Sequence, residues 1–66
     1  MEMQQKIKQM IGDTERNIRI SKEIILERQI LDENHDYLSK TLLTEEARLL
    51  KLYSKLGEFV DQEVAI

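Results

Sequence analysis

The segment from Ile18 to Leu31 constrains the fold most, because seven of its fourteen residues are Ile or Leu. A helix has about 3.6 residues per turn, so apolar residues this dense point in more than one direction. One neighbouring helix cannot cover them all. We therefore expect this segment to lie in the middle of an assembly of several helices. The seven residues are Ile18, Ile20, Ile24, Ile25, Leu26, Ile30 and Leu31.

The length of the chain favours self-association. Sixty-six residues make at most one domain, residues 1–66, and a chain this short buries only about 60% of the surface that its unfolded form exposes. Small domains compensate with disulfides, a structural metal or oligomerisation. The chain has no cysteine, which excludes disulfides, thiolate metal sites and thiol catalysis, and we expect a homo-oligomer.

The composition predicts an all-α protein. The chain has no proline and two glycines, with 35% charged and 41% apolar residues, which is typical of amphipathic helices. No apolar run approaches the roughly 18 residues that a membrane span needs, and the first twelve residues lack the apolar core of a signal peptide. These features predict a cytoplasmic protein that does not bind membranes.

The apolar spacing predicts a long first helix from near Glu2 to about Ser39. Gly12 and Asp13 are a possible break in it, because glycine is costly inside a helix and Asp is a competent N-cap, but we favour a continuous helix. Polar residues that favour turns are concentrated in residues 32–44. Because leucines keep helical spacing through this region, we expect the turn to lie late, between Ser39 and Leu43.

A shorter second helix is predicted from Glu45 to about Val64. Thr44 is a suitable N-cap, and the two glutamates that follow it suit the positive end of the helix dipole. Apolar residues then recur at helical spacing and form one face of this helix. They are Leu49, Leu52, Tyr53, Leu56, Phe59, Val60 and Val64.

The unequal lengths of these helices predict an uncovered surface. The first would span about 60 Å and the second about 30 Å, so a hairpin would leave the N-terminal half of the first helix bare. We expect Met3, Ile7, Met10 and Ile11 to bind a partner. Two copies would pair through the first helix as a homodimeric four-helix bundle or coiled coil. The core of that oligomer would contain Ile18, Ile24, Ile25 and Leu31.

Four polar residues interrupt the apolar spacing, namely Asn17, Ser21, Arg28 and His35. A polar residue within a coiled-coil interface can fix its register and the number of partners. The alternative is that the apolar stripe drifts around the helix, because 3.6 residues per turn does not match a seven-residue repeat. We favour drift for Arg28 and His35, and both interpretations stay open for Asn17.

The sequence gives little support for catalysis or metal binding. His35 is the sole histidine, and Asp32 precedes it by three residues. Metal-binding helical bundles use a similar carboxylate-x-x-His spacing on each of two helices, and this chain has only one such pair. A solvated histidine in a turn is the simpler interpretation. No phosphate-binding loop or nucleophile motif is present, so we expect no enzyme activity, no metal and no cofactor.

Two kinds of partner remain. We expect a protein partner, which would make the chain a small regulator or adaptor with an amphipathic helical surface. The alternative is a helical dimer that contacts RNA or the DNA backbone through Lys8, Arg16, Arg19 and Lys22. Interleaved acids and a pI near 5.1 disfavour it, because phosphate contacts contribute most of the affinity for nucleic acids.

Overall fold

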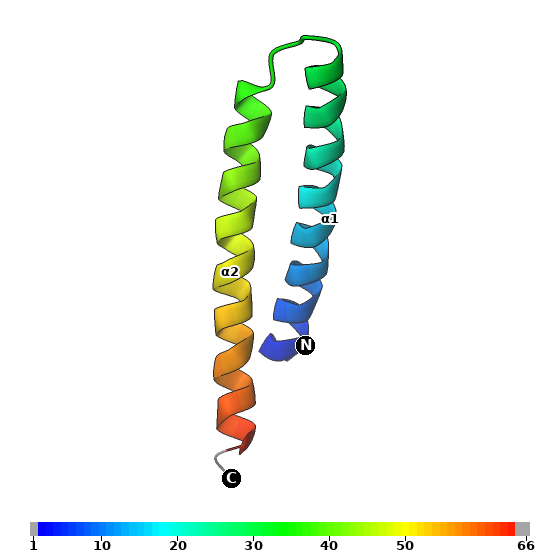
Figure 1. The fold of residues 1–66 in the computed structure, drawn as a ribbon. Helices are drawn as coiled ribbons and strands as arrows, with labels where there is room; N and C mark the ends of the chain where they lie inside the picture. Colours follow the sequence, from blue (N-terminus) through cyan, green and yellow to red (C-terminus); the bar gives the residue numbers. More distant parts are fainter. Residues whose placement is uncertain (1, 65–66) are drawn as a thin grey trace.

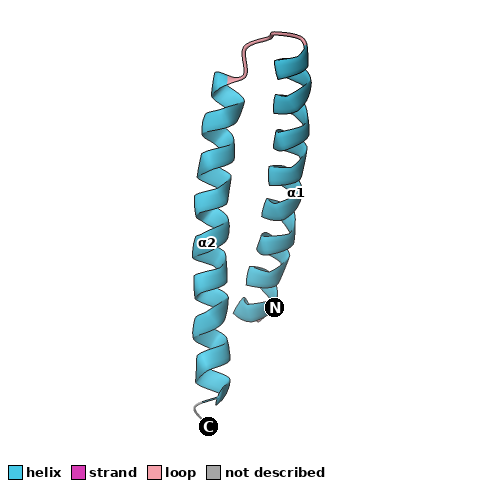
Figure 2. Ribbon diagram, viewed as in Figure 1, coloured by secondary structure: helices cyan, strands magenta, loops and turns pink. Residues whose placement is uncertain are grey.

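The chain folds into two long antiparallel helices. The computed structural model describes residues 2–64, and it describes the side chains of residues 2–59. Helix α1 spans Met3–Ile30 and helix α2 spans Asp36–Val64, with no strand among the described residues. The helices lie side by side, and the start of α1 and the end of α2 are at the same end of the molecule (Figures 1 and 2). The predicted all-α helical hairpin is confirmed.

Helix α1 continues through Gly12 without a break, as predicted. A glycine inside a helix costs about 1 kcal/mol relative to alanine. The turns on either side of Gly12 are held by buried side chains, because Ile11 and Thr14 both face α2. The glycine itself is exposed, and a Cβ added there would meet nothing within 4 Å.

The turn occupies residues 31–35, so its predicted position between Ser39 and Leu43 was wrong. Local polar contacts end α1 and begin α2. The Arg28 guanidinium donates to the carbonyl oxygen of Asn34 at 3.0 Å, and the Asn34 side chain accepts the backbone N–H of Asp36 at 2.8 Å. Asp32 takes a left-handed conformation with φ of 56°, which Asp tolerates better than most residues.

The predicted boundaries of both helices are corrected accordingly. Residues 36–44 belong to α2, so the first helix is shorter than expected and the second is longer. Thr44 does not cap a helix, because its hydroxyl donates to the carbonyl oxygen of Lys40 one turn earlier, at 3.1 Å. The mistake arose because Leu38 and Leu42 keep helical spacing, which they do as part of α2.

The core is a single line of contacts along the facing sides of the two helices, which we call the seam. Its buried residues are Ile7, Ile11, Thr14 and Ile18 of α1 and Leu52 of α2. Partly buried Met10, Leu49, Leu56 and Phe59 pack against it. Val60 and Val64, which we also placed on this face of the second helix, have side chains outside the described residues.

The two helices are almost equal in length, at 28 and 29 residues. Helix α2 therefore covers the N-terminal half of α1, and the prediction that this half is bare was wrong. Ile7, Ile11 and Ile18 are buried by α2 within one chain. The prediction failed because it placed residues 36–44 on the wrong helix.

Glu45 places one carboxylate oxygen in the seam without a hydrogen-bond partner among the described residues. Glu45 follows Leu42 by three residues and precedes Leu49 and Leu52 by four and seven, so it occupies a seam position in the N-terminal third of α2. Its Oε2 atom is buried and has no hydrogen-bond partner among the described residues. We had expected Glu45 in the first turn of the second helix, beside the helix dipole. It lies instead well inside α2, at a position where an apolar side chain would pack.

A two-helix rod buries little of its apolar surface. The molecule measures 55 × 18 × 13 Å, and no described side chain is fully buried. Among residues 2–64, neither helix is long and apolar enough to cross a membrane. Many large apolar side chains are exposed, namely Met3, Ile20, Leu26, Ile30, Leu31, Tyr37, Leu43, Leu50 and Tyr53.

Candidate binding surfaces

The eight residues predicted to bind a partner or another copy are divided between the seam and the surface. Ile7, Ile11 and Ile18 are buried in the seam, and Ile25 is half-buried. The other four each keep at least part of the side chain at the surface, and Met10 also packs against the seam. Met10 and Ile24 are half-buried, while Met3 is 68% exposed and Leu31 is 66% exposed.

The four accessible residues lie on one line, which we call the α1 stripe. It consists of Met3, Met10, Asn17, Ile24 and Leu31, which follow one another at intervals of seven. The seam follows the same period, because Ile11, Ile18 and Ile25 each come one residue after a member of the stripe. Side chains seven apart share a face, so the α1 stripe runs beside the seam. Met10 and Asn17 line a shallow hollow together with Arg48 of α2.

A second apolar surface lies on α2, and we call it the α2 face. It consists of Leu43, Leu50 and Tyr53, spaced by seven and three residues. Leu43 is 68% exposed and Leu50 is 73% exposed. Each residue of the α2 face comes one residue after a seam residue of α2. Each member of the α1 stripe, in contrast, comes one residue before a seam position of α1. In an antiparallel pair these offsets place the two surfaces on opposite sides of the hairpin.

The hydrogen bond between Tyr53 and Glu15 supports this placement. The Tyr53 hydroxyl donates to Oε1 of Glu15 at 2.7 Å, and Glu15 also follows a seam residue, Thr14, by one. The Glu15 carboxylate accepts the phenolic proton and so raises the pKa of Tyr53 above its usual value, with smaller contributions from desolvation and from the negative charge. The bond fixes the Tyr53 ring at the edge of the α2 face.

Sequence reasoning missed most of the α2 face. The predicted turn ends at Leu43, and Leu50 does not belong to the apolar face predicted for the second helix. The available signal was that each leucine comes one residue after a seam leucine, at Leu42 and Leu49. That spacing makes an apolar arc too wide for a single neighbouring helix to cover.

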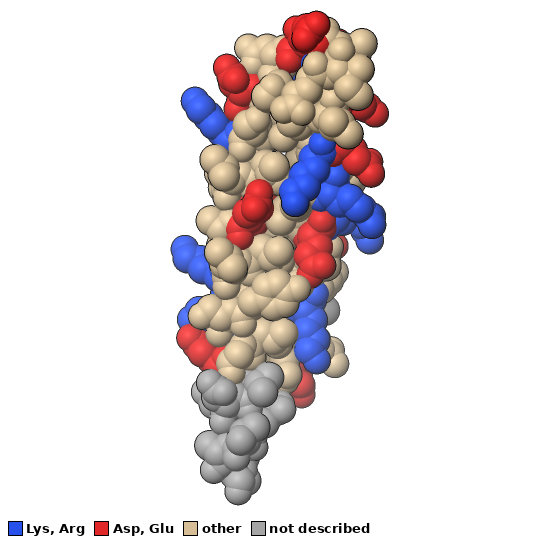
Figure 3. All heavy atoms as spheres, in the orientation of Figure 1, with Lys and Arg blue, Asp and Glu red and all other residues tan. Residues whose placement is uncertain are grey.

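The basic side chains of α1 are mixed with acids. Arg16 and Arg19 line a hollow that also contains Glu15, and Arg19 and Lys22 line another that contains Glu15 and Glu23. Blue basic atoms gather on the α1 side at mid-height in Figure 3, with red acidic atoms directly beside them, while uncharged atoms cover most of the α2 side. Nucleic-acid binding stays an untested alternative.

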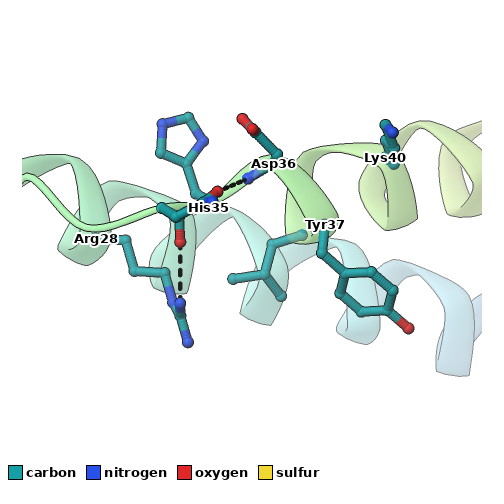
Figure 4. Close-up of a pocket in the computed structure, with 7 residues that line it drawn as sticks. Arg28, His35, Asp36, Tyr37 and Lys40 are labelled. Carbon is teal, nitrogen blue, oxygen red and sulfur yellow. Dashed lines mark hydrogen bonds between the residues drawn. The ribbon is translucent and has the colours of Figure 1, made fainter.

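A hollow lies at the turn between the two helices, and its polar side chains do not point toward a common centre. It has a volume of about 480 Å³. In Figure 4 the side chains of His35 and Asp36 point to one side of the chain, whereas those of Arg28 and Tyr37 point to the other. His35 is half-buried, and its Nδ1 lies 3.1 Å from the Ser39 hydroxyl. The polar groups of this hollow therefore stabilise the turn.

Asp32 and His35 do not share a helical face, because both lie in the turn. Among the residues that the structure describes, no group of three His, Asp or Glu side chains is placed to hold a metal ion. The two apolar surfaces are therefore the main candidates for a functional site.

Comparison with known proteins adds no further clue. No protein-family model matches the chain, and no curated protein or solved structure is detectably similar to it. Function must be argued from the two surfaces themselves.

Proposed function

We propose that this chain is a small cytoplasmic regulator or adaptor that binds another protein through an apolar helical surface and acts as a homo-oligomer. The observation that supports it most is the exposure of large apolar side chains on two opposite sides of a hairpin with only one thin seam. Contiguous exposed apolar residues mark interaction sites in soluble proteins. Isolated exposed leucines are common and would not support this proposal.

The α2 face is our candidate for the protein-binding surface. Leu43 and Leu50 lie two turns apart on the outside of α2, and burying each would contribute about 1.5 to 3 kcal/mol. Apolar anchors seven residues apart suit a partner helix that packs along α2. Tyr53 adds an aromatic ring that is already fixed by Glu15, so binding would cost it little side-chain entropy.

The predicted partner-binding set is changed by the fold. Ile7 and Ile11 are buried by α2, so a folded hairpin offers only Met3 and Met10 from that set. Those two residues belong to the α1 stripe, on the side opposite the α2 face. We therefore propose separate roles for the two surfaces, with a protein partner on α2 and self-association through α1.

A capture experiment tests the protein-binding role. A tagged copy with Leu43→Glu and Leu50→Glu would be compared with wild type in the native cells, with and without nuclease treatment. The matched control is Ala47→Glu with Ser54→Glu, which introduces the same charge at exposed α2 positions with the same spacing of seven. We expect a specific protein to be retained by wild type and control and lost by the leucine variant.

Two results would contradict the proposal. If wild type and the leucine variant capture the same proteins in equal amounts, the α2 face does not bind a protein. If the captured material disappears after nuclease treatment, the nucleic-acid alternative replaces the adaptor, and Arg16, Arg19 and Lys22 become the residues to mutate.

A further inference from the structure

We propose that the α1 stripe is the self-association surface, and that it pairs in antiparallel orientation with the same stripe of a second copy, Asn17 facing Asn17. The inference rests on the oligomeric part of the proposed function. It assigns the surface, the direction and the register of that oligomer.

The regularity of the stripe supports a helix-to-helix contact. Its members recur every seven residues from Met3 to Leu31, a length of about 42 Å at 1.5 Å per residue. Leu31 is the C-cap residue of α1, and its backbone N–H still donates to the carbonyl oxygen of Glu27 at 3.1 Å, as in the helix. A strict seven-residue repeat is the pattern that keeps two helices in contact as they wind around one another. Four of the five members are apolar, and Asn17 stands at the centre.

The order of residues along the stripe suits antiparallel pairing. Reversing one copy about Asn17 places Met3 opposite Leu31 and Met10 opposite Ile24 of the second copy. Each layer then combines a flexible methionine with a branched side chain, which allows the methionine to fill the space that is left. Both ends of the contact are thereby closed by apolar pairs.

The charges along the edge of the stripe favour the same direction. Lys6, Asp13, Ile20 and Glu27 follow the stripe members by three residues and lie on its outer side. In a parallel dimer each of the three charged residues would face the identical residue of the second chain, and the two like charges would repel each other. In the antiparallel dimer Lys6 comes within about one residue, or 1.5 Å along the axis, of Glu27 of the second copy.

Asn17 fixes the register. An amide side chain has both donors and an acceptor, so two facing asparagines can satisfy each other. A shift of seven residues would place each asparagine against an apolar side chain and leave its amide unsatisfied. A single polar residue in an otherwise apolar contact specifies register in this way, at some cost in stability.

Helix α2 does not offer an equivalent surface on this side of the hairpin. The α2 positions that come one residue before Leu42, Leu49 and Leu56 are Thr41, Arg48 and Lys55, and Arg48 lines the same hollow as Met10 and Asn17. These polar and basic side chains, of which Lys55 is paired with Glu58 at 3.6 Å, do not offer an apolar contact to a second α2 helix. The contact is therefore between the two α1 helices.

Disulfide trapping tests the direction directly, because the chain has no cysteine of its own. A tagged Met10→Cys chain would be mixed with an untagged Ile24→Cys chain and mildly oxidised. We expect a disulfide between the tagged and untagged chains, and little product from Met10→Cys alone. Leu50→Cys, on the opposite side of the hairpin, is the control that reports random collisions.

The orientation is wrong if Met10→Cys alone is trapped faster than the mixture, which would indicate a parallel dimer. The surface is wrong if the mixture forms no more disulfide than Leu50→Cys does. Neither result depends on protein capture by Leu43 and Leu50, so the adaptor role and the self-association surface can fail independently.

An isosteric charge change provides the second test. Asn17→Asp leaves the hairpin intact, because Asn17 is exposed there, but it places two like charges opposite one another in the dimer. We expect dimerisation to weaken about tenfold or more at neutral pH and to recover when the pH is lowered enough to protonate the aspartates. Gln9→Glu makes the same charge change on the exposed side of α1, and it should leave dimerisation unchanged. Equal dimerisation of the two variants would overturn the proposed register.

Discussion

At the scale of single residues, Tyr53 and Glu15 connect the two helices through the side-chain hydrogen bond that spans the hairpin (2.7 Å). Because this bond raises the pKa of Tyr53, it favours the protonated phenol in the folded state. Its contribution to stability is complete below the ordinary tyrosine pKa of about 10. The contribution is lost as the pH rises through the folded-state pKa.

We predict that Tyr53 titrates above pH 10 in a Tyr37→Phe background, where it is the one tyrosine left. The increase in tyrosinate absorbance with pH measures this directly. Adding Glu15→Gln removes the carboxylate acceptor and should return the midpoint toward the value of a free tyrosine. An unchanged midpoint in the Glu15→Gln variant would show that the hydrogen bond is not formed in solution.

At the scale of the helices, the seam of α2 is apolar except at Glu45 among the side chains that the structure describes. Leu38, Leu42, Leu49, Leu52, Leu56 and Phe59 occupy the other seam positions up to residue 59. A buried polar atom without a partner costs about 1 to 3 kcal/mol. The Oε2 atom of Glu45 is in that condition, so this position of α2 should lower the stability of the seam.

We predict that Glu45→Leu raises the free energy of unfolding by about 1 to 3 kcal/mol, measured by urea denaturation at a fixed chain concentration. The control is Glu46→Leu, one residue later and exposed, which should change stability by about 0.5 kcal/mol or less. A Glu45→Leu chain no more stable than wild type would mean that the carboxylate is satisfied in solution.

The sequence predicted that the chain forms two helices, favoured continuity of the first through Gly12, and predicted most of the α2 seam. Strong apolar periodicity determines each of these features. It did not predict the turn. Leu38 follows Leu31 by seven residues, so the period of the first helix continues in phase into the second. Periodicity therefore cannot distinguish a continuing helix from one that ends and begins again. The contacts of Arg28 and Asn34 decide it.

The candidate surfaces were predicted in part, for the same reason. The misplaced turn made the first helix too long and left Ile7 and Ile11 apparently uncovered. Once residues 36–44 pass to α2, these isoleucines are buried, while Met3 and Met10 stay accessible beside Ile24 and Leu31. Helix α1 has two adjacent apolar lines, the α1 stripe and the residues of the seam. Packing decides which of them faces α2, and the spacing of the residues alone does not.

At the scale of the whole molecule, the hairpin is a thin rod with one seam between two helices and apolar surfaces on both sides. Each helix buries one line of side chains against the other, and residues 2–64 contain no third element to cover the remainder. Additional helices from other chains would complete the core, as is usual for domains too small to stabilise themselves. These exposed surfaces lead to the claim that the hairpin associates with another chain.

The most direct test of that claim is the mass of the purified wild-type chain in solution, measured by sedimentation equilibrium over a range of concentrations. We predict that the mass rises from 7.9 kDa to a plateau at twice that value as concentration increases. A mass that stays at that of one chain up to the highest concentration would contradict the account. The hairpin would then be stable alone, with its α1 stripe exposed to water.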